Sequence, residues 1–170
     1  MKIAHTYRSA ALASLAAASF WISSVCLAGS VPTELAGTWE LVAADVEHPD
    51  GTRGPDYGAD PSGLLIIDKQ GRYSLQIFKS ERERFSSGDK ASGTPTEYRD
   101  AVMGSSTHFG TISINSRERT IVFRIQHASF PNWEGTQQPR TYELKGTEFS
   151  YRVTPRPNGD IPISIWKRLD

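Results

Sequence analysis

The sequence predicts an all-β protein, an eight-stranded antiparallel up-and-down β-barrel, on the basis of three observations. After the first 28 residues, apolar side chains recur at every second position in short runs, as in half-buried strands. Gly, Pro, Asn and Asp separate many of these runs in short turns, which join sequential antiparallel neighbours. Closing such strands into a barrel removes the exposed edges of a flat sheet, and the interior is just wide enough for side chains or one small ligand.

The first 28 residues have the pattern of a secretory signal peptide. Lys2 and Arg8 form a basic start, an uncharged stretch rich in Ala, Leu and Ser follows, and cleavage is expected after Ala28. The alternative is an uncleaved anchor, but the apolar stretch is short and broken by Ser, so no stable membrane insertion is expected after cleavage. Cleavage also removes Cys26, the one cysteine. Residues 29–170 are therefore expected to form one thiol-free barrel domain, periplasmic or secreted.

Eight runs in this domain carry the strand pattern. They are Gly37–Val46, Gly63–Asp68, Arg72–Lys79, Thr107–Asn115, Thr120–His127, Arg140–Lys145, Glu148–Thr154 and Ile161–Arg168. Two connections are longer than the rest, His48 to Pro61 and Ser80 to Gly104. The second is charged and is expected to be either a solvated disordered loop or a lid, with one helical turn near Tyr98–Met103.

Composition excludes several classes of function. The chain has 19 Lys and Arg against 19 Asp and Glu, without a basic stripe, so nucleic acid is not an expected partner. Phosphate-binding glycine loops, paired-cysteine metal motifs and a Gly-x-Ser-x-Gly elbow do not occur. The four histidines show no ligand spacing. No cofactor and no metal site are predicted.

The first run contains Gly37-Thr38-Trp39, which resembles the Gly-x-Trp opening of the lipocalin and calycin barrels. The resemblance implies that Trp39 plugs the closed end of the barrel and that a basic residue of the last strand, here Arg168, lies across its ring. A guanidinium over an indole face contributes about 0.5–2 kcal/mol. Gly37, Trp39 and Arg168 are therefore the expected closure residues.

Further segments narrow the resemblance to the short lipocalin-like domain family of bacteria and fungi. They are Pro61–Leu65 with Asp68–Ser74, His108–Thr111, and Phe130–Thr136 with Gln138 and Arg140. The resemblance runs from Leu35 to about Arg168 and implies a barrel with an internal pocket rather than a particular reaction. A His often stands in that family where this sequence has Arg124, so no role of that His carries over.

Strand alternation gives the candidate binding residues, because the more apolar phase of each strand should face inward. This alternation predicts that the side chains of Ala43 and His127 face the inside of the barrel. The last strand is ambiguous, since its isoleucines share one phase while Trp166 and Arg168 share the other; a bulge near Ser164 would reconcile them. The predicted ligand-binding residues are Tyr73, His108, Phe123, His127, Trp133, Arg140 and Tyr142.

His127 and Arg140 flank the Phe130–Trp133 loop, so all three are expected near one end of the barrel. A buried Arg requires a partner. That partner is the acid of a bound apolar ligand, or Glu134, or water at the rim. The loop is a ligand gate if it covers the open mouth and a structural plug if it covers the end near Trp39.

Three functions fit these features. The first is a protein that binds a small hydrophobic or amphipathic ligand in the barrel, which needs only a lined cavity and a few polar groups. The second is a small enzyme, for example an isomerase or cyclase, with His108 or His127 as acid or base and Arg140 holding an oxyanion. The third is a module with a filled barrel that meets another protein through its loops. The first requires least of the sequence.

Overall fold

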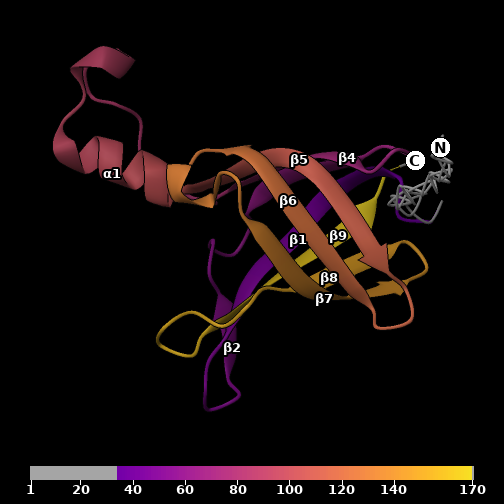
Figure 1. Ribbon diagram of the computed structural model, residues 1–170. Coiled ribbons are helices and arrows are strands. Elements are labelled where there is room, and N and C mark those ends of the chain that lie inside the picture. Colours follow the sequence, from indigo (N-terminus) through magenta and orange to yellow (C-terminus); the bar gives the residue numbers. More distant parts are fainter. Residues whose placement is uncertain (1–33, 170) are drawn as a thin grey trace, which may run out of the picture.

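The computed structural model describes residues 34–169, so the expected signal peptide lies outside the described residues. The chain folds into a closed antiparallel β-barrel, as predicted (Figure 1). Eight strands form the barrel, and each pairs with its neighbours in sequence order. They are β1 (Gly37–Glu47), β3 (Ser62–Ile67), β4 (Arg72–Phe78), β5 (Ser105–Asn115), β6 (Thr120–Ala128), β7 (Gln137–Lys145), β8 (Glu148–Arg152) and β9 (Ile161–Arg168).

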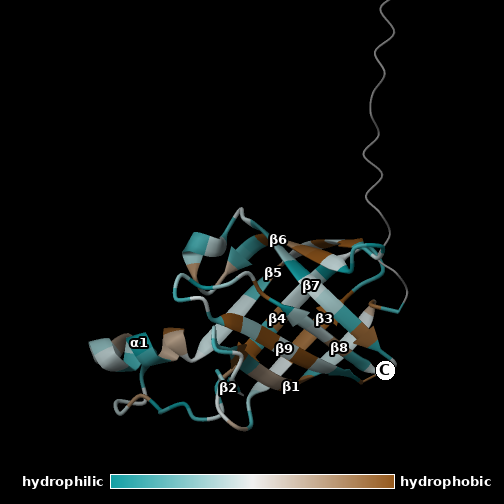
Figure 2. Ribbon diagram, turned by 90° about the horizontal axis from the view of Figure 1, so that it is seen from below, coloured by the Kyte–Doolittle hydropathy of each residue, from teal (hydrophilic) through white to brown (hydrophobic). Residues whose placement is uncertain are grey.

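The barrel closes because β1 pairs with β3 on one side and with β9 on the other. Tight turns join most of the other neighbours. In the turn between β3 and β4, for example, Gly71 has φ 81° and its N–H donates to the Asp68 carbonyl oxygen. Hydropathy alternates along the strands in Figure 2, as expected for a sheet with one buried and one solvated face.

Both long connections contain structure that the strand pattern does not show. β2 (Arg53–Pro55) pairs with the end of β1 and forms an extra edge strand outside the barrel. The connection between β4 and β5 contains a short 3-10 helix, η1 (Lys90–Ser92), and α1 (Pro95–Met103). A capping box starts α1: Thr94 accepts from the Glu97 backbone N–H, and Glu97 accepts from the Thr94 backbone N–H. In Figure 1, α1 projects away from the barrel, and none of its residues is buried.

Two register shifts change which side chains face inward. Between Leu41 and Ala43 of β1 the pairing with β9 slips, so Ala44 is buried and the expected inward position of Ala43 is wrong. The bulge near Ser164 that would reconcile the two phases of β9 does not occur, because the pairing of β9 with β8 continues through Ser164 without a shift. Ser164 and Trp166 are buried, and so is Ile163 of the other phase.

The second shift lies between Phe109 and Gly110 of β5, opposite β6. It reverses the alternation at the end of β6: Ile125 is buried, but His127 is exposed. The prediction that His127 faces inward is therefore wrong. Gly110 is required at this point, because a Cβ there would overlap the Arg124 carbonyl oxygen.

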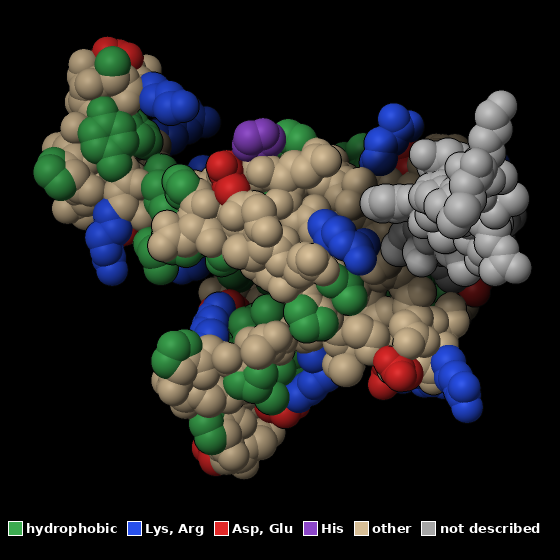
Figure 3. Space-filling model, viewed as in Figure 1, with side chains coloured by type: hydrophobic (Ala, Val, Ile, Leu, Met, Phe, Trp, Pro, Cys, Tyr) green, Lys and Arg blue, Asp and Glu red, His purple; other side chains and the backbone are tan. Residues whose placement is uncertain are grey.

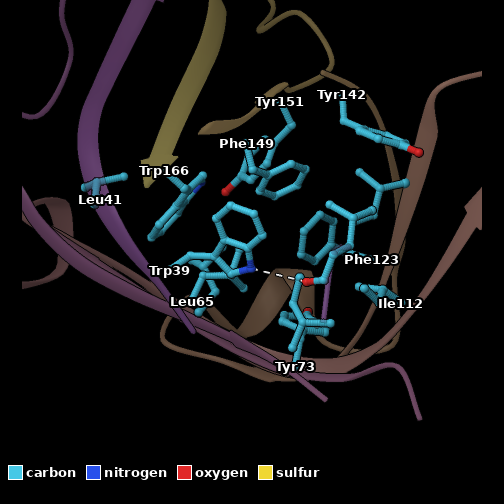
Figure 4. Close-up of a cluster of buried hydrophobic side chains, with 14 of the residues drawn as sticks. Trp39, Leu41, Leu65, Tyr73, Ile112, Phe123, Tyr142, Phe149, Tyr151 and Trp166 are labelled. Atoms are coloured by element: carbon cyan, nitrogen blue, oxygen red, sulfur yellow. Dashed lines mark hydrogen bonds between the residues drawn. The ribbon is translucent and has the colours of Figure 1, made fainter. Parts of the chain in front are cut away.

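Aromatic rings fill the half of the barrel that contains Trp39 (Figure 4), and the buried core continues from there to cavity-wall residues such as Leu75 and Ile77. Trp39, Phe149 and Trp166 are fully enclosed. The Trp39 and Phe149 rings lie 5.4 Å apart, and Phe149 in turn contacts Tyr142 and Tyr151 at 6.0 and 5.8 Å. This end of the barrel leaves no room for a ligand among these rings.

Candidate ligand-binding site

The closed end is held by Arg168, which joins the last strand to the first. Its guanidinium carbon lies 4.2 Å from the centre of the Trp39 ring. The guanidinium also donates to the backbone carbonyl oxygens of Ala36, at 2.9 Å, and Glu34. Trp39 itself donates from Nε1 to the Leu35 carbonyl oxygen at 3.2 Å. Gly37, the first residue of β1, has a φ of 151°.

A cavity of about 350 Å³ occupies the opposite half of the barrel. It lies where β1, β4, β6 and β8 end and where β5, β7 and β9 begin, which is the open end. Apolar side chains such as Leu75 and Ile77 form much of its wall. The aromatic and polar groups that line it include Tyr57, His108, Trp133, Gln138, Arg140 and Tyr151.

Arg140 is the most deeply buried charged residue in the lining of this cavity, with only 6% of the residue exposed. The guanidinium carbon lies 4.2 Å from the centre of the Phe123 ring and 4.7 Å from that of Tyr151. Nη2 donates to Gln138 Oε1 at 2.9 Å, whereas Nε is enclosed without a hydrogen-bond partner. Burial lowers the pKa of Arg140, and the nearby Tyr151 hydroxyl opposes this effect.

No carboxylate within residues 34–169 pairs with Arg140. Glu134, one expected partner, instead lies 3.4 Å from His127 Nδ1 and accepts from the Ala128 N–H at 3.2 Å. The low exposure of Arg140 also excludes a side chain that reaches past the rim into bulk water. Glu134 and bulk water at the rim are therefore not the partners of Arg140, and the geometry allows the acid of a bound molecule inside the cavity.

His108 is a second polar residue in the cavity wall, and Tyr73 forms a hydrogen bond with it on the side away from the cavity. The Tyr73 hydroxyl lies 2.7 Å from His108 Nδ1, and both side chains are buried. Burial, with a smaller contribution from the positive charge of Arg140, lowers the pKa of His108 to about 3. Burial also raises the pKa of Tyr73. At neutral pH the site therefore contains a neutral imidazole and a protonated phenol.

The Phe130–Trp133 loop lies at the open end, on the cavity side of the barrel. Its last three residues form the 3-10 helix η2 (Pro131–Trp133), and Gly135 (φ 75°) turns the chain into β7. The Trp133 ring lines the cavity, 6.0 Å from His108 and 5.5 Å from Phe130. The loop is therefore placed as a wall of the mouth, whereas Trp39 and Arg168 close the other end.

Three other charged residues line the same cavity, Arg156, Asp56 and Asp45, and each is paired. Arg156 forms two hydrogen bonds to the Asp56 carboxylate, at 3.2 and 2.5 Å. Asp45 is held by Arg53 at 2.8 Å. Each of these charges is balanced by its partner, so Arg140 supplies the uncompensated charge of the cavity.

The structure brings five of the seven predicted binding residues together. His108, Trp133 and Arg140 line the cavity, while Tyr73 and Phe123 stand directly behind them, with ring centres 4.8 Å apart. The other two lie elsewhere. Tyr142 packs on Phe149 towards the closed end, and the His127 side chain is 67% exposed on the outer surface.

Among the lining residues that the sequence analysis did not name as binding candidates are Tyr57, Gln138 and Tyr151. Gln138 is detectable, because it lies two residues before Arg140 and so shares its face of β7. Tyr151 has the inward phase of β8 as well. Tyr57 lies in a connection without strand periodicity, and no sequence signal places it at the cavity.

The described part of the chain shows neither a metal-binding cluster nor a membrane-spanning helix. Among residues 34–169, no cluster of three or more His, Cys, Asp or Glu side chains could hold a metal ion, and no helix could span a membrane. Basic and acidic side chains are scattered over the face shown in Figure 3, without a patch of one sign.

The profile of the lipocalin-like domain family matches residues 36–169, most of the chain. The chain belongs to the lipocalin-like domain family. This confirms the resemblance read from the Gly-x-Trp opening and the Phe-Pro-Asn-Trp loop. No curated protein matches this lipocalin-like protein significantly.

Two solved structures are similar to the lipocalin-like barrel. One is a lipocalin-like protein from Bacteroides uniformis ATCC 8492, with 19% identity and a TM-score of 0.41 over 80% of this chain and 99% of the other. The other is a point mutant of the fluorescent protein UnaG, with 11% identity and a TM-score of 0.34 over 80% of this chain and 96% of the other.

Proposed function

We propose that this lipocalin-like protein binds a small, mainly apolar molecule with an anionic group in the cavity at the open end of the barrel. The observation that carries the proposal is Arg140, a buried guanidinium with no carboxylate partner in residues 34–169. Burying an unpaired charge costs several kcal/mol. A ligand carboxylate would supply the missing opposite charge, and a guanidinium can bind it through two parallel hydrogen bonds.

The rest of the cavity suits an apolar ligand body. Its volume of about 350 Å³ is at the small end of the range of ligand sites, roughly 300–1,000 Å³. Trp133, Leu75 and Ile77 contribute to a wall whose surface is mostly apolar, although many of the lining side chains also carry a polar group. The proposed ligand enters acid first, with its apolar body against Trp133 at the mouth.

We further propose that the mature protein acts in the periplasm or outside the cell. The support is the sequence of the first 28 residues, with its basic start, uncharged stretch and small residues before the expected cleavage after Ala28. N-terminal sequencing of the protein from the envelope and culture-medium fractions tests this proposal. A mature protein that retains Met1 in the cytoplasmic fraction would contradict it.

An enzyme is the second candidate, and one observation favours it. His108 is hydrogen-bonded to a Tyr hydroxyl beside the cavity, as an acid–base site would require. However, its pKa of about 3 makes the imidazole a weak base at neutral pH, when an efficient general base has a pKa near the working pH. Binding therefore remains the better supported function.

The third candidate, a protein-interaction module with a filled barrel, has less support. The rings of Trp39, Phe149 and Trp166 fill only the closed half of the barrel. A cavity of about 350 Å³ remains in the other half. An interaction through the loops would give no reason for a cavity that contains a buried, partly unpaired Arg140.

Native mass spectrometry of the mature protein, purified from the envelope fraction of its own host, tests the proposed function. The expected result is a stoichiometric small molecule that denaturation releases. In parallel, calorimetric titration with aromatic and aliphatic carboxylic acids and with their primary amides should show preference for the acids.

Arg140→Met should weaken binding of the acids by about tenfold to a hundredfold, because it removes charge-assisted hydrogen bonds, and should affect the amides little. Arg124→Met is the matched control, since Arg124 is exposed on the outer face of the neighbouring strand β6. Repeated recovery of empty protein, together with no binding of any acid in the panel, would refute the proposal.

A further inference from the structure

The Tyr73–His108 pair determines which ring nitrogen of His108 carries the proton. The two residues lie on neighbouring strands, β4 and β5, and the Tyr73 hydroxyl is 2.7 Å from Nδ1. Both side chains are 4% exposed. Since the imidazole is neutral, one ring nitrogen is a donor and the other an acceptor.

Two arrangements of the proton are possible. If Nδ1–H donated to the Tyr73 oxygen, the Tyr73 O–H would need another acceptor, and within residues 34–169 its hydrogen-bond partner is His108 alone. If the Tyr73 O–H donates to Nδ1, the phenol proton is satisfied and the imidazole proton is on Nε2. The second arrangement avoids an unsatisfied buried donor, so it is the favoured one.

The Nε2–H of His108 then faces the cavity. Nδ1 is turned towards Tyr73 behind the wall, and His108 lines the cavity from the other side. Within the described part of the chain no side chain or backbone group accepts from Nε2, and it is not one of the fully enclosed unpaired atoms, which are Arg140 Nε and Trp166 Nε1. The Nε2–H group of His108 is therefore a neutral donor without a protein acceptor in the described residues, and it lines the same cavity as the Arg140 guanidinium.

The charges of the cavity indicate what such a pair of donors would bind. Asp56 balances Arg156, Arg53 balances Asp45, and His108 is neutral, which leaves the single positive charge of Arg140. One positive charge and one neutral donor match a group with one negative charge and two acceptor oxygens. A carboxylate has both properties, whereas a phosphate monoester brings a second negative charge.

We propose that the cavity binds a compact monocarboxylate through two donors, the Arg140 guanidinium and the Nε2–H of His108, and that Tyr73 is the positioning residue that orients the second donor. This inference rests on the proposed function and specifies its ligand class. The size of the cavity selects a compact acid, and the rings of Trp133, Tyr57 and Tyr151 in its wall favour an aromatic one.

The tautomer can be measured without any ligand. Long-range ¹H–¹⁵N correlation spectra of the ¹⁵N-labelled mature protein at pH 7 should show His108 with its proton on Nε2. Tyr73→Phe, which keeps the buried ring, should shift this pattern towards a mixture of tautomers. A wild-type spectrum with the proton on Nδ1 overturns the inference, and this measurement does not depend on how well the variant folds.

Binding is measured with 2-naphthoate, 2-naphthamide and 2-naphthyl phosphate as probes. Wild-type protein should bind 2-naphthoate more tightly than the phosphate, and Tyr73→Phe should weaken 2-naphthoate binding by about tenfold with little effect on the amide. Tyr98→Phe is the control, because the Tyr98 hydroxyl forms its hydrogen bonds with the backbone of Lys90 and Gly93, in the connection between β4 and β5.

The outcomes separate this inference from the proposed function. If Tyr73→Phe binds 2-naphthoate as tightly as wild type while Arg140→Met loses it, the second donor is refuted and the proposed function stands. Tighter binding of the phosphate than of the carboxylate refutes the monocarboxylate class alone. If wild-type protein binds no acid at all, both proposals fall.

Discussion

Arg140 and Phe123 face each other inside the barrel, with the guanidinium carbon 4.2 Å from the ring centre. The Tyr151 ring is also within 4.7 Å of the same carbon, and Gln138 accepts one hydrogen bond. These neutral contacts keep the charge in place without neutralising it. An unpaired cation in the wall of a cavity lowers the stability of the folded protein, and it can bind the charged group of an anionic ligand.

The first prediction follows from this cost. Arg140→Met replaces the buried charge by a shorter, unbranched apolar side chain, which removes the desolvation penalty. The variant without ligand should be as stable as wild type or more stable, by up to about 1–2 kcal/mol, in urea unfolding at pH 7. A loss of stability of several kcal/mol would instead indicate that Arg140 is mainly a structural residue of the core.

The second prediction concerns the closed end. Arg168→Ala removes the cation–π contact with Trp39 and hydrogen bonds to the Ala36 and Glu34 carbonyl oxygens. The free energy of unfolding should fall by about 1–4 kcal/mol, measured by denaturant titration. Lys167→Ala changes the exposed neighbouring residue, and its stability should stay within about 0.5 kcal/mol of wild type.

The third prediction tests the bulge beside β6. Gly110→Ala would place a Cβ against the Arg124 carbonyl oxygen, which is backbone and cannot move without breaking the strand pairing. We expect a loss of about 2 kcal/mol or more, or failure to fold, by thermal and urea unfolding. Gly54→Ala, where nothing lies within 4 Å of the added Cβ, should be close to wild type. Equal stabilities for both variants would contradict the register shift.

The fourth prediction is a pH dependence of stability. The folded pKa of His108 is lowered to about 3 from 6.5, so between these values the unfolded chain binds more protons than the folded one. The His108 contribution to stability is therefore present above about pH 6.5 and is lost as the pH falls towards 3, with a slope of up to about 1.4 kcal/mol per pH unit. In His108→Gln this part of the slope should disappear.

Urea midpoints at several pH values between 7 and 4 measure this effect. Carboxylates whose pKa is lowered by hydrogen bonds, such as those of Glu47 and Asp68, lose stability in the same direction at lower pH. The comparison with His108→Gln isolates the histidine. Identical slopes in the two proteins would show that His108 is not held neutral by its burial.

The fifth prediction concerns the mouth of the cavity. Trp133 lines it, whereas Trp39 and Trp166 are fully enclosed in the closed half. A bound aromatic acid should therefore change the fluorescence of Trp133 and leave that of the other two nearly constant. In Trp133→Phe the titration signal should largely vanish while calorimetry still detects binding. A full signal in the variant would place the ligand elsewhere.

Much of the architecture follows from the amino-acid sequence alone. The eight barrel strands, their order and the closed barrel follow from period-two alternation and short turns, since tight turns force neighbours in sequence to pair. The resemblance of the Gly-x-Trp opening, narrowed by the Phe130–Thr136 segment, predicted the right family. Arg140 was identified as an inward-facing cation because it is the polar member of an apolar phase on β7.

The tertiary structure decided the features that alternation does not encode. A register shift in one strand depends on its partner, so His127 and Ala43 were assigned to the wrong face. The only local sign was Gly110 within a strand. Only the structure shows that the Phe130–Trp133 loop lines the open mouth, that Glu134 contacts His127, and that Tyr73 contacts His108. These contacts join strands and loops whose separation along the chain does not indicate their distance in space.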